Sequence, residues 1–276
     1  MSEAPRISVC IPVYNGAAHL ADCLRSVAAQ EVPRLEIVVS DDNSSDGSLD
    51  VIAGVQKEFP GTDWRVVRNP IRLGMAGNWN ACVEAASGQL IKVMGQDDIL
   101  YPGCLAAQAA IIASEAEVAV CACAGDICSA SGRKIPLRRK KHDEGIHSGN
   151  KLIEDCLRTA ANPIGEPVTT MFRKTDFQKT GGFDLSMRYY IDVDMWLRLL
   201  GNRKFAFIEK SYCGFRVHRG GASFTLQGEG YSEFLRMENK LNSRRPLPQR
   251  VRFVRRISAF RDSCLRLAAY RIFGAI

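Results

Sequence analysis

The first half of the chain alternates short apolar runs with stretches of helical periodicity. Apolar runs predict strands at residues 7–12, 35–40, 64–68, 89–94 and 117–123. Between them, apolar positions spaced three or four residues apart predict helices at residues 17–30, 48–59, 76–86 and 101–114. Repeated β-α units of this kind predict an α/β fold with a mostly parallel central sheet flanked by helices. Ligands of such sheets bind at the carboxyl ends of the strands.

The alternation stops after residue 126. Residues 129–150, with the basic run 138–141, predict a hairpin or surface loop, and a phosphate-contacting flap is the alternative. Further on, the pattern predicts helices at residues 151–157 and 191–200 and strands at 168–173, 204–207 and 212–217. Helical character resumes from about residue 229, with breaks at Pro246 and Pro248.

Composition describes an ordinary globular chain with a sizeable core. It has 276 residues, of which 46% are hydrophobic and 24% charged, which excludes a disordered protein. No apolar stretch reaches the length of a membrane-spanning helix, and residues 1–5 lack the features of a signal peptide, so we expect a cytoplasmic protein. The ten cysteines lie mostly in apolar runs, which predicts buried thiols in a reducing compartment.

The net charge of +7 is concentrated at the end of the chain, because residues 231–276 contain eleven basic and three acidic side chains. Within residues 249–276, apolar positions such as Val251 and Ile257 alternate at helical spacing with arginines such as Arg252 and Arg255. This basic amphipathic pattern suits an anionic membrane surface, or equally a terminal helix docked on the domain with a solvated arginine face. No base-reading element is present, so we expect no nucleic-acid partner.

Acidic residues follow the predicted strand at residues 89–94. Asp97 and Asp98 stand together there, and two adjacent carboxylates call for a metal ion or hydrogen-bond donors nearby. The alternative is that they cap the following helix. No Gly-rich dinucleotide motif and no P-loop occurs, so the charge of a bound diphosphate would have to be met by a metal ion or by basic groups.

Two other strand ends carry polar residues suited to a nucleotide. Tyr14 and Asn15 offer a ring and an amide where a base or ribose could lie, although a plain turn into a helix explains them about as well. Residues 41–47 contain three carboxylates and two serines. Ser44 or Ser45 is expected to cap the next helix, but capping does not require three acids, which favours a base- or ribose-binding role.

Seven motifs occur in one order over roughly residues 6–225: ISVCIPVYN (7–15), DDNSSDG (41–47), NWN (78–80), GQLIKVMGQDD (88–98), GGFD (181–184), DVDMWLRL (192–199) and FRVH (215–218). In this order they resemble glycosyltransferase family 2, the inverting enzymes with a GT-A fold. The resemblance implies a nucleotide-binding part (1–125) and an acceptor-binding part (126–228) within a domain of residues 1–228, followed by the basic helical tail, residues 229–276.

The resemblance also implies roles for individual residues. Asp42 is similar to the residue that hydrogen-bonds uracil or thymine, with Pro12, Tyr14 and Asn15 lining the base pocket. Asp97 matches the position that meets ribose or donor sugar, and Asn80 and Arg216 match further substrate-binding positions. Asp98 matches the ligand of Mn²⁺ or Mg²⁺, and His218 resembles a group that meets the metal or the diphosphate. Without the motif, His218 would be interpreted as an ordinary loop histidine.

Asp192 is the expected catalytic base, because an inverting transfer needs a carboxylate near the acceptor hydroxyl. A carboxylate at the start of a helix also stabilises the helix dipole, which is the structural alternative. The family usually has two consecutive acids here, whereas this chain has Ile191 before Asp192, and Asp194 is the second candidate.

The function implied is sugar transfer from a UDP- or dTDP-sugar to a saccharide or lipid-linked acceptor in cell-surface polysaccharide or lipopolysaccharide synthesis. A tail bound to membrane would place the chain at the inner face of the cell membrane. The alternatives are a nucleotidyltransferase, disfavoured because residues 11–16 lack a basic residue, and a nucleotide-sugar-binding protein with a degenerate site.

Overall fold

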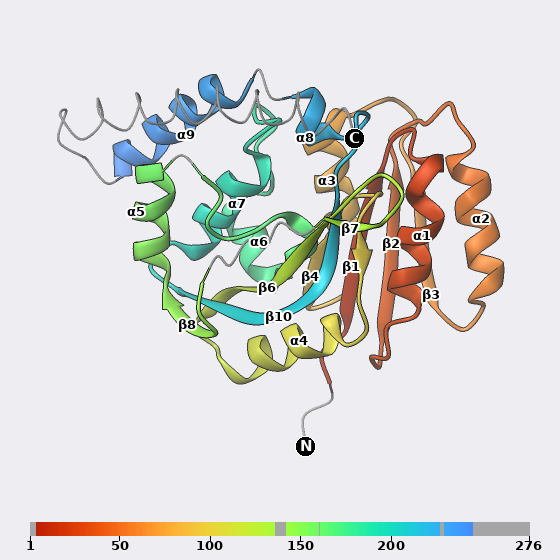
Figure 1. The fold of residues 1–276 in the computed structure, drawn as a ribbon, viewed down its shortest axis with the longest axis horizontal. Helices are drawn as coiled ribbons and strands as arrows, with labels where there is room; N and C mark the ends of the chain where they lie inside the picture. Colours follow the sequence, from red (N-terminus) through yellow and green to blue (C-terminus); the bar gives the residue numbers. More distant parts are fainter. Residues whose placement is uncertain (1–3, 136–141, 160, 227–228, 245–276) are drawn as a thin grey trace.

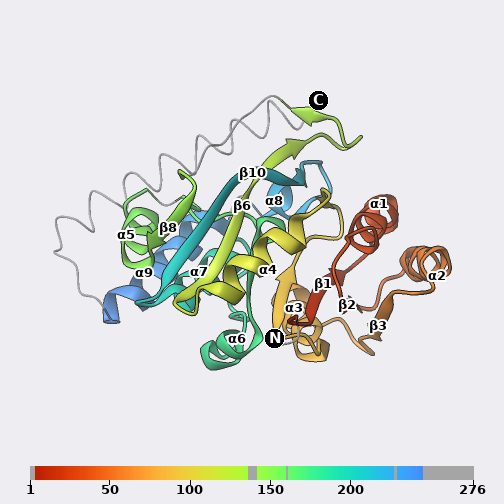
Figure 2. The ribbon, with the colours of Figure 1, turned by 90° about the horizontal axis from the view of Figure 1, so that it is seen from below.

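A central β-sheet with helices on both faces forms the protein (Figures 1 and 2). The computed structural model describes residues 4–135, 142–159, 161–226 and 229–244. The strands are β1 (Ile7–Val13), β2 (Leu35–Asp41), β3 (Asp63–Arg68), β4 (Leu90–Val93), β5 (Ile99–Leu100), β6 (Val118–Cys128), β7 (Lys134–Ile135), β8 (Gly145–Ser148), β9 (Thr170–Arg173) and β10 (Lys204–Arg216). The helices are α1 (Ala17–Ala28), α2 (Ser48–Glu58), α3 (Gly74–Ala85), α4 (Cys104–Ser114), α5 (Gly149–Thr159), α6 (Lys174–Thr180), α7 (Ile191–Leu200), α8 (Ala222–Thr225) and α9 (Gly230–Arg244), with a 3-10 turn, η1, at Pro167–Thr169.

The strand order and directions bring the carboxyl ends of the parallel strands to one edge of the sheet. It runs β3-β2-β1-β4-β9-β6-β10-β5, with β7 beside β6 and β8 beside β10. β1 pairs in parallel with β2 and β4, β2 with β3, and β6 with β10. β9 runs antiparallel to both β4 and β6. The amino end of β9 therefore lies at the same edge as the carboxyl ends of β1, β4, β6 and β10.

Alternate side chains of the strands point into two apolar cores, as expected for a sheet covered on both faces. In β1, Val9 and Ile11 face a core that includes residues of α1, α2 and α4. Cys10 faces the other core, which includes residues of α3, α5, α6, α7 and α9. The nine cysteines in the described residues are all buried and free, which confirms the buried thiols expected there.

The predicted α/β fold with a mostly parallel, helix-flanked sheet is confirmed, with local differences. The two strands expected at 204–207 and 212–217 are one long strand, β10, whose register against β6 shifts between Ile208 and Cys213. This bulge exposes Glu209 and Lys210 and breaks the apolar pattern. The helix expected from residue 101 begins at Cys104, because Tyr101 instead donates its backbone N–H to β10 at Tyr212 O. The short elements β5, α6 and α8 were missed.

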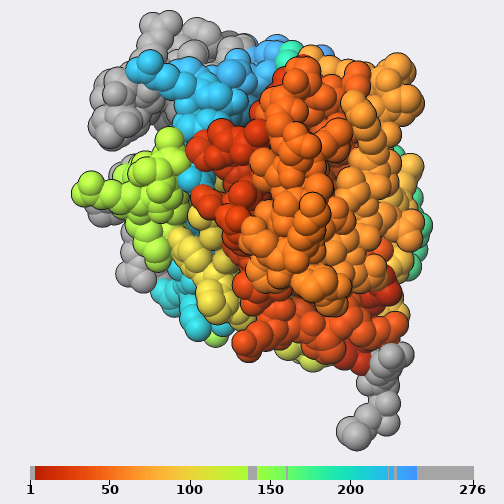
Figure 3. Space-filling model, turned by 90° about the vertical axis from the view of Figure 1, so that its right-hand side faces the viewer, coloured from red at the N-terminus to blue at the C-terminus, as the bar shows by residue number. Residues whose placement is uncertain are grey.

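The hairpin expected in residues 129–150 forms in part, since β7 turns back along β6. It projects beside the face built from the N-terminal half (Figure 3). The basic run 138–141 lies outside the described residues.

Helix α9 packs on the same core as α7, because Phe234 and Met237 are buried there. The basic amphipathic segment 249–276, predicted either to bind an anionic membrane surface or to dock on the domain, lies outside the described residues. Within the described part of the chain, no helix has both the length and the apolar character needed to cross a membrane.

Candidate active site

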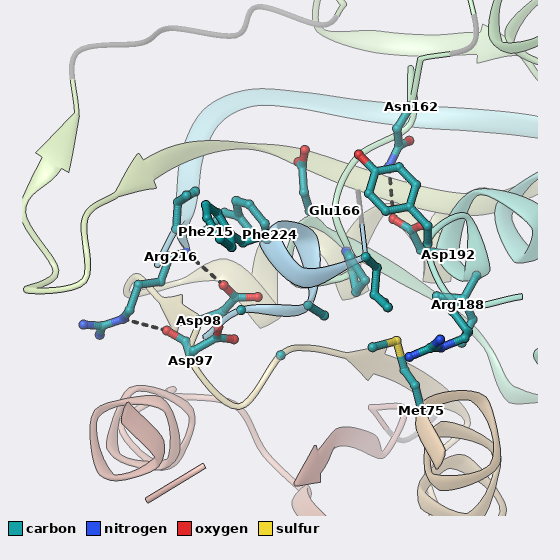
Figure 4. Close-up of a pocket in the computed structure, with 18 of the residues that line it drawn as sticks. Met75, Asp97, Asp98, Asn162, Glu166, Arg188, Asp192, Phe215, Arg216 and Phe224 are labelled. Atoms are coloured by element: carbon teal, nitrogen blue, oxygen red, sulfur yellow. Dashed lines mark hydrogen bonds between the residues drawn. The ribbon is translucent and has the colours of Figure 1, made fainter. Parts of the chain in front are cut away.

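A cavity of about 580 Å³ opens at the edge of the sheet where the parallel strands end. One side is formed by Asp97 and Asp98, in the loop after β4, and by Arg216 and His218, at the end of β10. The opposite side is formed by Asn162, Arg188 and Asp192, and Glu166 lies between the two sides (Figure 4). The topology thus brings together four segments that are separated in the sequence: residues 97–98, 162–166, 188–192 and 216–218.

Asp98 is the deeply buried acid of this cavity. Its Oδ1 accepts a hydrogen bond from the backbone N–H of Arg216 at 3.0 Å, and the residue is only 2% exposed. Burial, and then the neighbouring carboxylate of Asp97, raise the pKa of Asp98 well above its ordinary value. A cation beside Asp98 would relieve this destabilisation of the ionised form.

Arg216 holds the acidic loop against the end of β10. Its Nε donates to the backbone oxygen of Asp97 at 2.8 Å, and its terminal nitrogens contact Ala130 O at 2.7 Å and the Asp22 carboxylate at 3.4 Å. These contacts, in a residue only 4% exposed, fix the loop. The predicted substrate contact of Arg216 stays a prediction.

His218 pairs with Asp97 rather than with the predicted metal ligand Asp98. Its Nε2 lies 2.8 Å from Asp97 Oδ2, and its ring packs edge-on against His19 with centroids 4.8 Å apart. The two predicted functions, sugar contact for Asp97 and metal or diphosphate contact for His218, therefore belong to side chains that touch each other.

The described residues contain no cluster of three or more His, Cys, Asp or Glu side chains arranged to hold a metal ion. Mg²⁺, however, is commonly held by one or two carboxylates together with substrate phosphates. Asp98, buried and facing the cavity, suits an ion shared with a diphosphate, and Asp97 stands beside it. The acids present therefore fit Mg²⁺ or Mn²⁺ held jointly with a ligand.

The predicted base-binding residues lie outside the wall of this cavity. Pro12 is buried in β1, while Tyr14 is exposed, with the Arg72 guanidinium 3.9 Å from its ring centre. Tyr14 exchanges two backbone hydrogen bonds with the amide of Gln96, at 2.9 and 3.1 Å. The loop after β1 is thereby fastened directly to the loop that carries Asp97 and Asp98.

Asn15 and Asp46 connect the loops after β1 and β2. Asn15, which has a positive φ of 48°, donates its N–H to Ser44 Oγ and accepts from the N–H of Ser45. Neither Ser44 nor Ser45 caps α2 as expected. Asp46 instead accepts the N–H groups of Ser48 and Ala17, so one carboxylate serves the starts of two helices.

Asp42 anchors the segment between β3 and α3. Its carboxylate accepts the backbone N–H groups of Leu73 (2.7 Å) and Gly74 (2.9 Å) and the side-chain amide of Asn69 (3.1 Å), and the residue is 2% exposed. These bonds explain why an acid is needed at this position even without a ligand. The predicted contact between Asp42 and a pyrimidine ring stays a prediction.

Asn80 also contacts the protein's own backbone. Its amide donates to Phe183 O at 2.9 Å and accepts from Phe183 N–H at 2.7 Å, and it does not line the cavity. It thereby fixes the turn at Gly181 and Gly182, both of which have positive φ angles near 80°. Its predicted substrate contact likewise remains a prediction.

The two candidate bases on α7 have different surroundings. Asp192 lines the cavity and accepts a hydrogen bond from the Asn162 amide at 3.1 Å on its Oδ2. Asp194 is buried and forms an ion pair with Arg198, with contacts of 2.8 and 2.7 Å, away from the cavity wall. The geometry thus favours Asp192 over Asp194 as a group that could meet a ligand.

Sequence reasoning missed Asn162, Glu166 and Arg188, which complete the cavity. Asn162 and Glu166 lie in a Pro- and Gly-containing stretch just before β9, the strand that is antiparallel to its two neighbours. Polar residues in that turn were the available signal, but a strand assumed to be parallel would have placed them at the far edge of the sheet. No signal singled out Arg188.

Comparison with known proteins identifies the family. The Glycosyl transferase family 2 profile matches residues 8–181. An uncharacterized protein of Mycobacterium tuberculosis is 36% identical over 203 residues, covering 71% of this chain and 62% of that protein. The GalNAc(5)-diNAcBac-PP-undecaprenol beta-1,3-glucosyltransferase of Campylobacter jejuni is 35% identical over 101 residues, covering 37% and 32%. The chain therefore spans less than two thirds of either relative.

Solved structures of low sequence identity share the fold. TarS 1-349 of S. aureus, in complex with UDP, superimposes with a TM-score of 0.67 at 19% identity, covering 90% of this chain and 68% of that one. The mannosyltransferase PcManGT of Pyrobaculum calidifontis, in complex with GDP-Man and Mn²⁺, gives 0.68 at 19% identity and covers 100% and 77%. The family expected from the seven motifs is confirmed: the chain belongs to glycosyl transferase family 2 and has the GT-A fold.

Proposed function

We propose that this chain is a metal-dependent, inverting glycosyltransferase that moves a sugar from a nucleoside diphosphate donor to an acceptor hydroxyl. The observation that carries the proposal is the presence of two acid groups, Asp97–Asp98 and Asp192, on opposite sides of one cavity (Figure 4). Sugar transfer needs a site for the diphosphate and a separate base for the acceptor, and the two acid groups would serve these two roles.

At the donor side, Asp98 would hold Mn²⁺ or Mg²⁺ together with the diphosphate, and His218 would contact the metal ion or the diphosphate. The ion, when bound, would reduce the negative charge that develops on the leaving diphosphate. Asp97 would accept a hydrogen bond from a hydroxyl of the ribose or of the donor sugar, and Arg216 holds its loop in place. Support for the ion comes from the fit of the buried Asp98 and from the Mn²⁺ present in the PcManGT complex.

At the acceptor side, Asp192 would take the proton from the attacking hydroxyl. In an inverting displacement the nucleophile approaches from the side opposite the leaving group, and Asp192 lies across the cavity from Asp98. The Asn162 amide, bonded to Asp192 Oδ2, would hold the carboxylate in a fixed orientation. Ile191, at the position where the family usually has a second acid, is buried and lines the same cavity, so it would add an apolar surface beside Asp192 and no second carboxylate.

The nucleotide base would lie beside the loops after β1 and β2, against Tyr14 and near Pro12, Asn15 and Asp42. The hydrogen bonds between Tyr14 and Gln96 support this placement, because they join these loops to the Asp97–Asp98 loop. UDP and dTDP are the nucleotides proposed. GDP-sugars belong in the test as well, since PcManGT was solved in complex with GDP-Man.

The acceptor is proposed to be a saccharide or a lipid-linked saccharide in cell-surface polysaccharide or lipopolysaccharide synthesis. The relative whose name includes PP-undecaprenol supports a lipid-linked acceptor. The corresponding location is the cytoplasm, at the inner face of the cell membrane if residues 249–276 bind an anionic surface.

The test is a thermal-shift screen of UDP-, dTDP- and GDP-sugars with and without Mn²⁺ or Mg²⁺. A donor at a hundred times its dissociation constant should stabilise the fold by about 2.7 kcal/mol. In Asp98→Asn the metal-dependent part of the thermal shift should disappear. Asp176 is a buried acid on α6 outside the cavity, so Asp176→Asn should keep the metal-dependent shift. If no donor raises the melting temperature with metal present, the proposal is wrong.

Turnover separates the enzyme from its alternatives. The transferase should release nucleoside diphosphate from the stabilising donor, and Asp98→Asn should lose this release. A degenerate binder would show the thermal shift without release, and a nucleotidyltransferase would instead release pyrophosphate from a nucleoside triphosphate.

A further inference from the structure

Glu233, on α9, binds three consecutive backbone N–H groups of the segment before α7. Its Oε1 accepts from Arg188 at 2.8 Å, and its Oε2 accepts from Tyr189 at 2.8 Å and Tyr190 at 2.9 Å. The residue is completely buried. The carboxylate therefore fastens the last helix of the described chain to a segment about 45 residues earlier in the sequence.

The segment that Glu233 holds leads directly to the proposed base. Tyr190 is the N-cap of α7, and Asp192 is the second residue of that helix. Arg188, Tyr189 and Tyr190 also line the cavity. Any change in the path of residues 188–190 would therefore move both the acceptor-side wall and the carboxylate of Asp192.

Three N–H groups in a row form a cradle for an anion, and a helix N-terminus adds favourable electrostatics. Here the protein's own carboxylate fills the cradle. Hydrogen bonds to a charged acceptor are shorter and stronger than those between neutral groups. This segment contains no regular element of its own, so side-chain contacts such as those of Glu233 hold its backbone in place.

Further contacts tie α9 to the same region. Arg188 forms an ion pair with Glu229 at 2.6 Å, and Lys240 pairs with Asp184. The Phe234 ring contacts the Tyr190 ring, with centroids 6.2 Å apart. Figures 1 and 2 show α9 lying alongside α7, and Phe234 is buried in the core to which α7 contributes.

We propose that Glu233 is a positioning residue for the transfer reaction, which sets the backbone of residues 188–190 and through it the position of Asp192. The inference rests on the proposed function for the role of Asp192. It makes residues 229–244, predicted to begin a separate tail, a working part of the acceptor side of the cavity.

The test compares Glu233→Gln with Glu36→Gln. A glutamine at 233 replaces one of the two accepting oxygens by an NH₂ donor, which cannot accept a backbone N–H. Glu36 is the matched control, because it is also buried and accepts the Ser87 N–H and two serine hydroxyls. It lies on β2 opposite the amino end of β1, at the edge of the sheet away from the cavity.

Two readouts are measured: amide hydrogen exchange at residues 188–190, and the rate of nucleoside diphosphate release with water as acceptor. In Glu233→Gln we expect exchange at these amides to accelerate at least tenfold and kcat to fall about tenfold or more, with the UDP- and Mn²⁺-dependent thermal shift retained. Glu36→Gln should have a lower melting temperature than the wild type, but the same kcat and the same amide exchange rates at residues 188–190. If Glu233→Gln does not fold, Glu233→Asp, which keeps both oxygens on a shorter side chain, should show the same changes in smaller degree.

Wild-type exchange at residues 188–190 in a folded Glu233 variant would overturn the inference, as would faster exchange with unchanged kcat. An equal fall of kcat in Glu36→Gln would show general destabilisation and overturn it as well. If the wild-type chain releases no nucleoside diphosphate from any donor, the proposed function fails, while the exchange measurement still decides whether Glu233 sets the path of residues 188–190.

Discussion

Two acids on α7, only two residues apart, should respond in opposite ways to the same substitution. Asp192 faces the cavity, whereas Asp194 is buried against Arg198, whose side chain is 18% exposed. Asp192→Asn should lower the rate of sugar transfer by a factor of about 10²–10⁴, the usual contribution of a general base. Its effect on stability should stay within about 0.5 kcal/mol, because the amide can still accept the Asn162 hydrogen bond.

Asp194→Asn should instead destabilise the fold. Breaking a buried ion pair costs about 3–5 kcal/mol when one charge is left without its partner. The loss here should be nearer 2–3 kcal/mol by this measure, since the new amide oxygen still accepts one bond and Arg198 also donates to Thr180 O and Gly182 O. At about 2–4 °C per kcal/mol, the melting temperature should fall by roughly 4–12 °C.

The assay measures melting temperature and single-turnover transfer of both variants at a temperature where both are folded. The reasoning is refuted if Asp194→Asn abolishes transfer without a change in melting temperature, because Asp194 would then be the base. It is also refuted if Asp192→Asn retains the wild-type rate.

Three further predictions follow from the cavity and the core. Asp98→Asn should raise the melting temperature of the ligand-free chain, and more so at pH 8 than at pH 5. Because the pKa of Asp98 is raised in the folded state, the wild-type fold loses stability as the pH rises through that pKa and the buried carboxyl ionises. Asparagine does not titrate, so the variant avoids this loss. A gain that shrinks with rising pH would contradict this sign. Asn80→Ala should cost about 2 kcal/mol, because both backbone groups of Phe183 lose their partner, while nucleotide-dependent stabilisation persists; loss of that stabilisation alone would show that Asn80 contacts the donor. The nine cysteines of the described residues should react with a thiol reagent only after unfolding, since burial raises the pKa of thiols such as Cys10 and Cys23 and blocks access, and fast reaction of any of them in the native chain would contradict the burial.

The fold was largely predictable because the apolar periodicity of its first half is strong. The strands from β1 to β4 and the helices between them were expected within a few residues, and their order defines the parallel part of the sheet. The direction of β9 was not predictable in this way. A four-residue apolar strand has the same pattern in either direction, and only its pairing with β4 and β6 decides the matter.

The same limit explains which site residues were missed. Asp97 and Asp98 follow a parallel strand, so their place at the edge of the sheet where the cavity opens could be expected from the topology of a β-α repeat. Glu166 and Asn162 precede an antiparallel strand, which brings its amino end to that edge. Motif resemblance found Asp192, yet it could not show that Asn80 and Asp42 are bonded to the protein's own backbone.

The contacts of Asp42, Asn80 and Glu233 share one physical feature. Each polar side chain satisfies backbone groups of a segment that has no regular secondary structure, and the segment held by Glu233 also lines the cavity. Buried N–H groups must find an acceptor, so an irregular loop at a precise position requires a fixed side chain from elsewhere. Motif residues of this kind would be retained for the loops they hold as much as for a ligand. A substitution that weakens transfer therefore identifies a contact with substrate only when the loop it supports has been shown to stay in place.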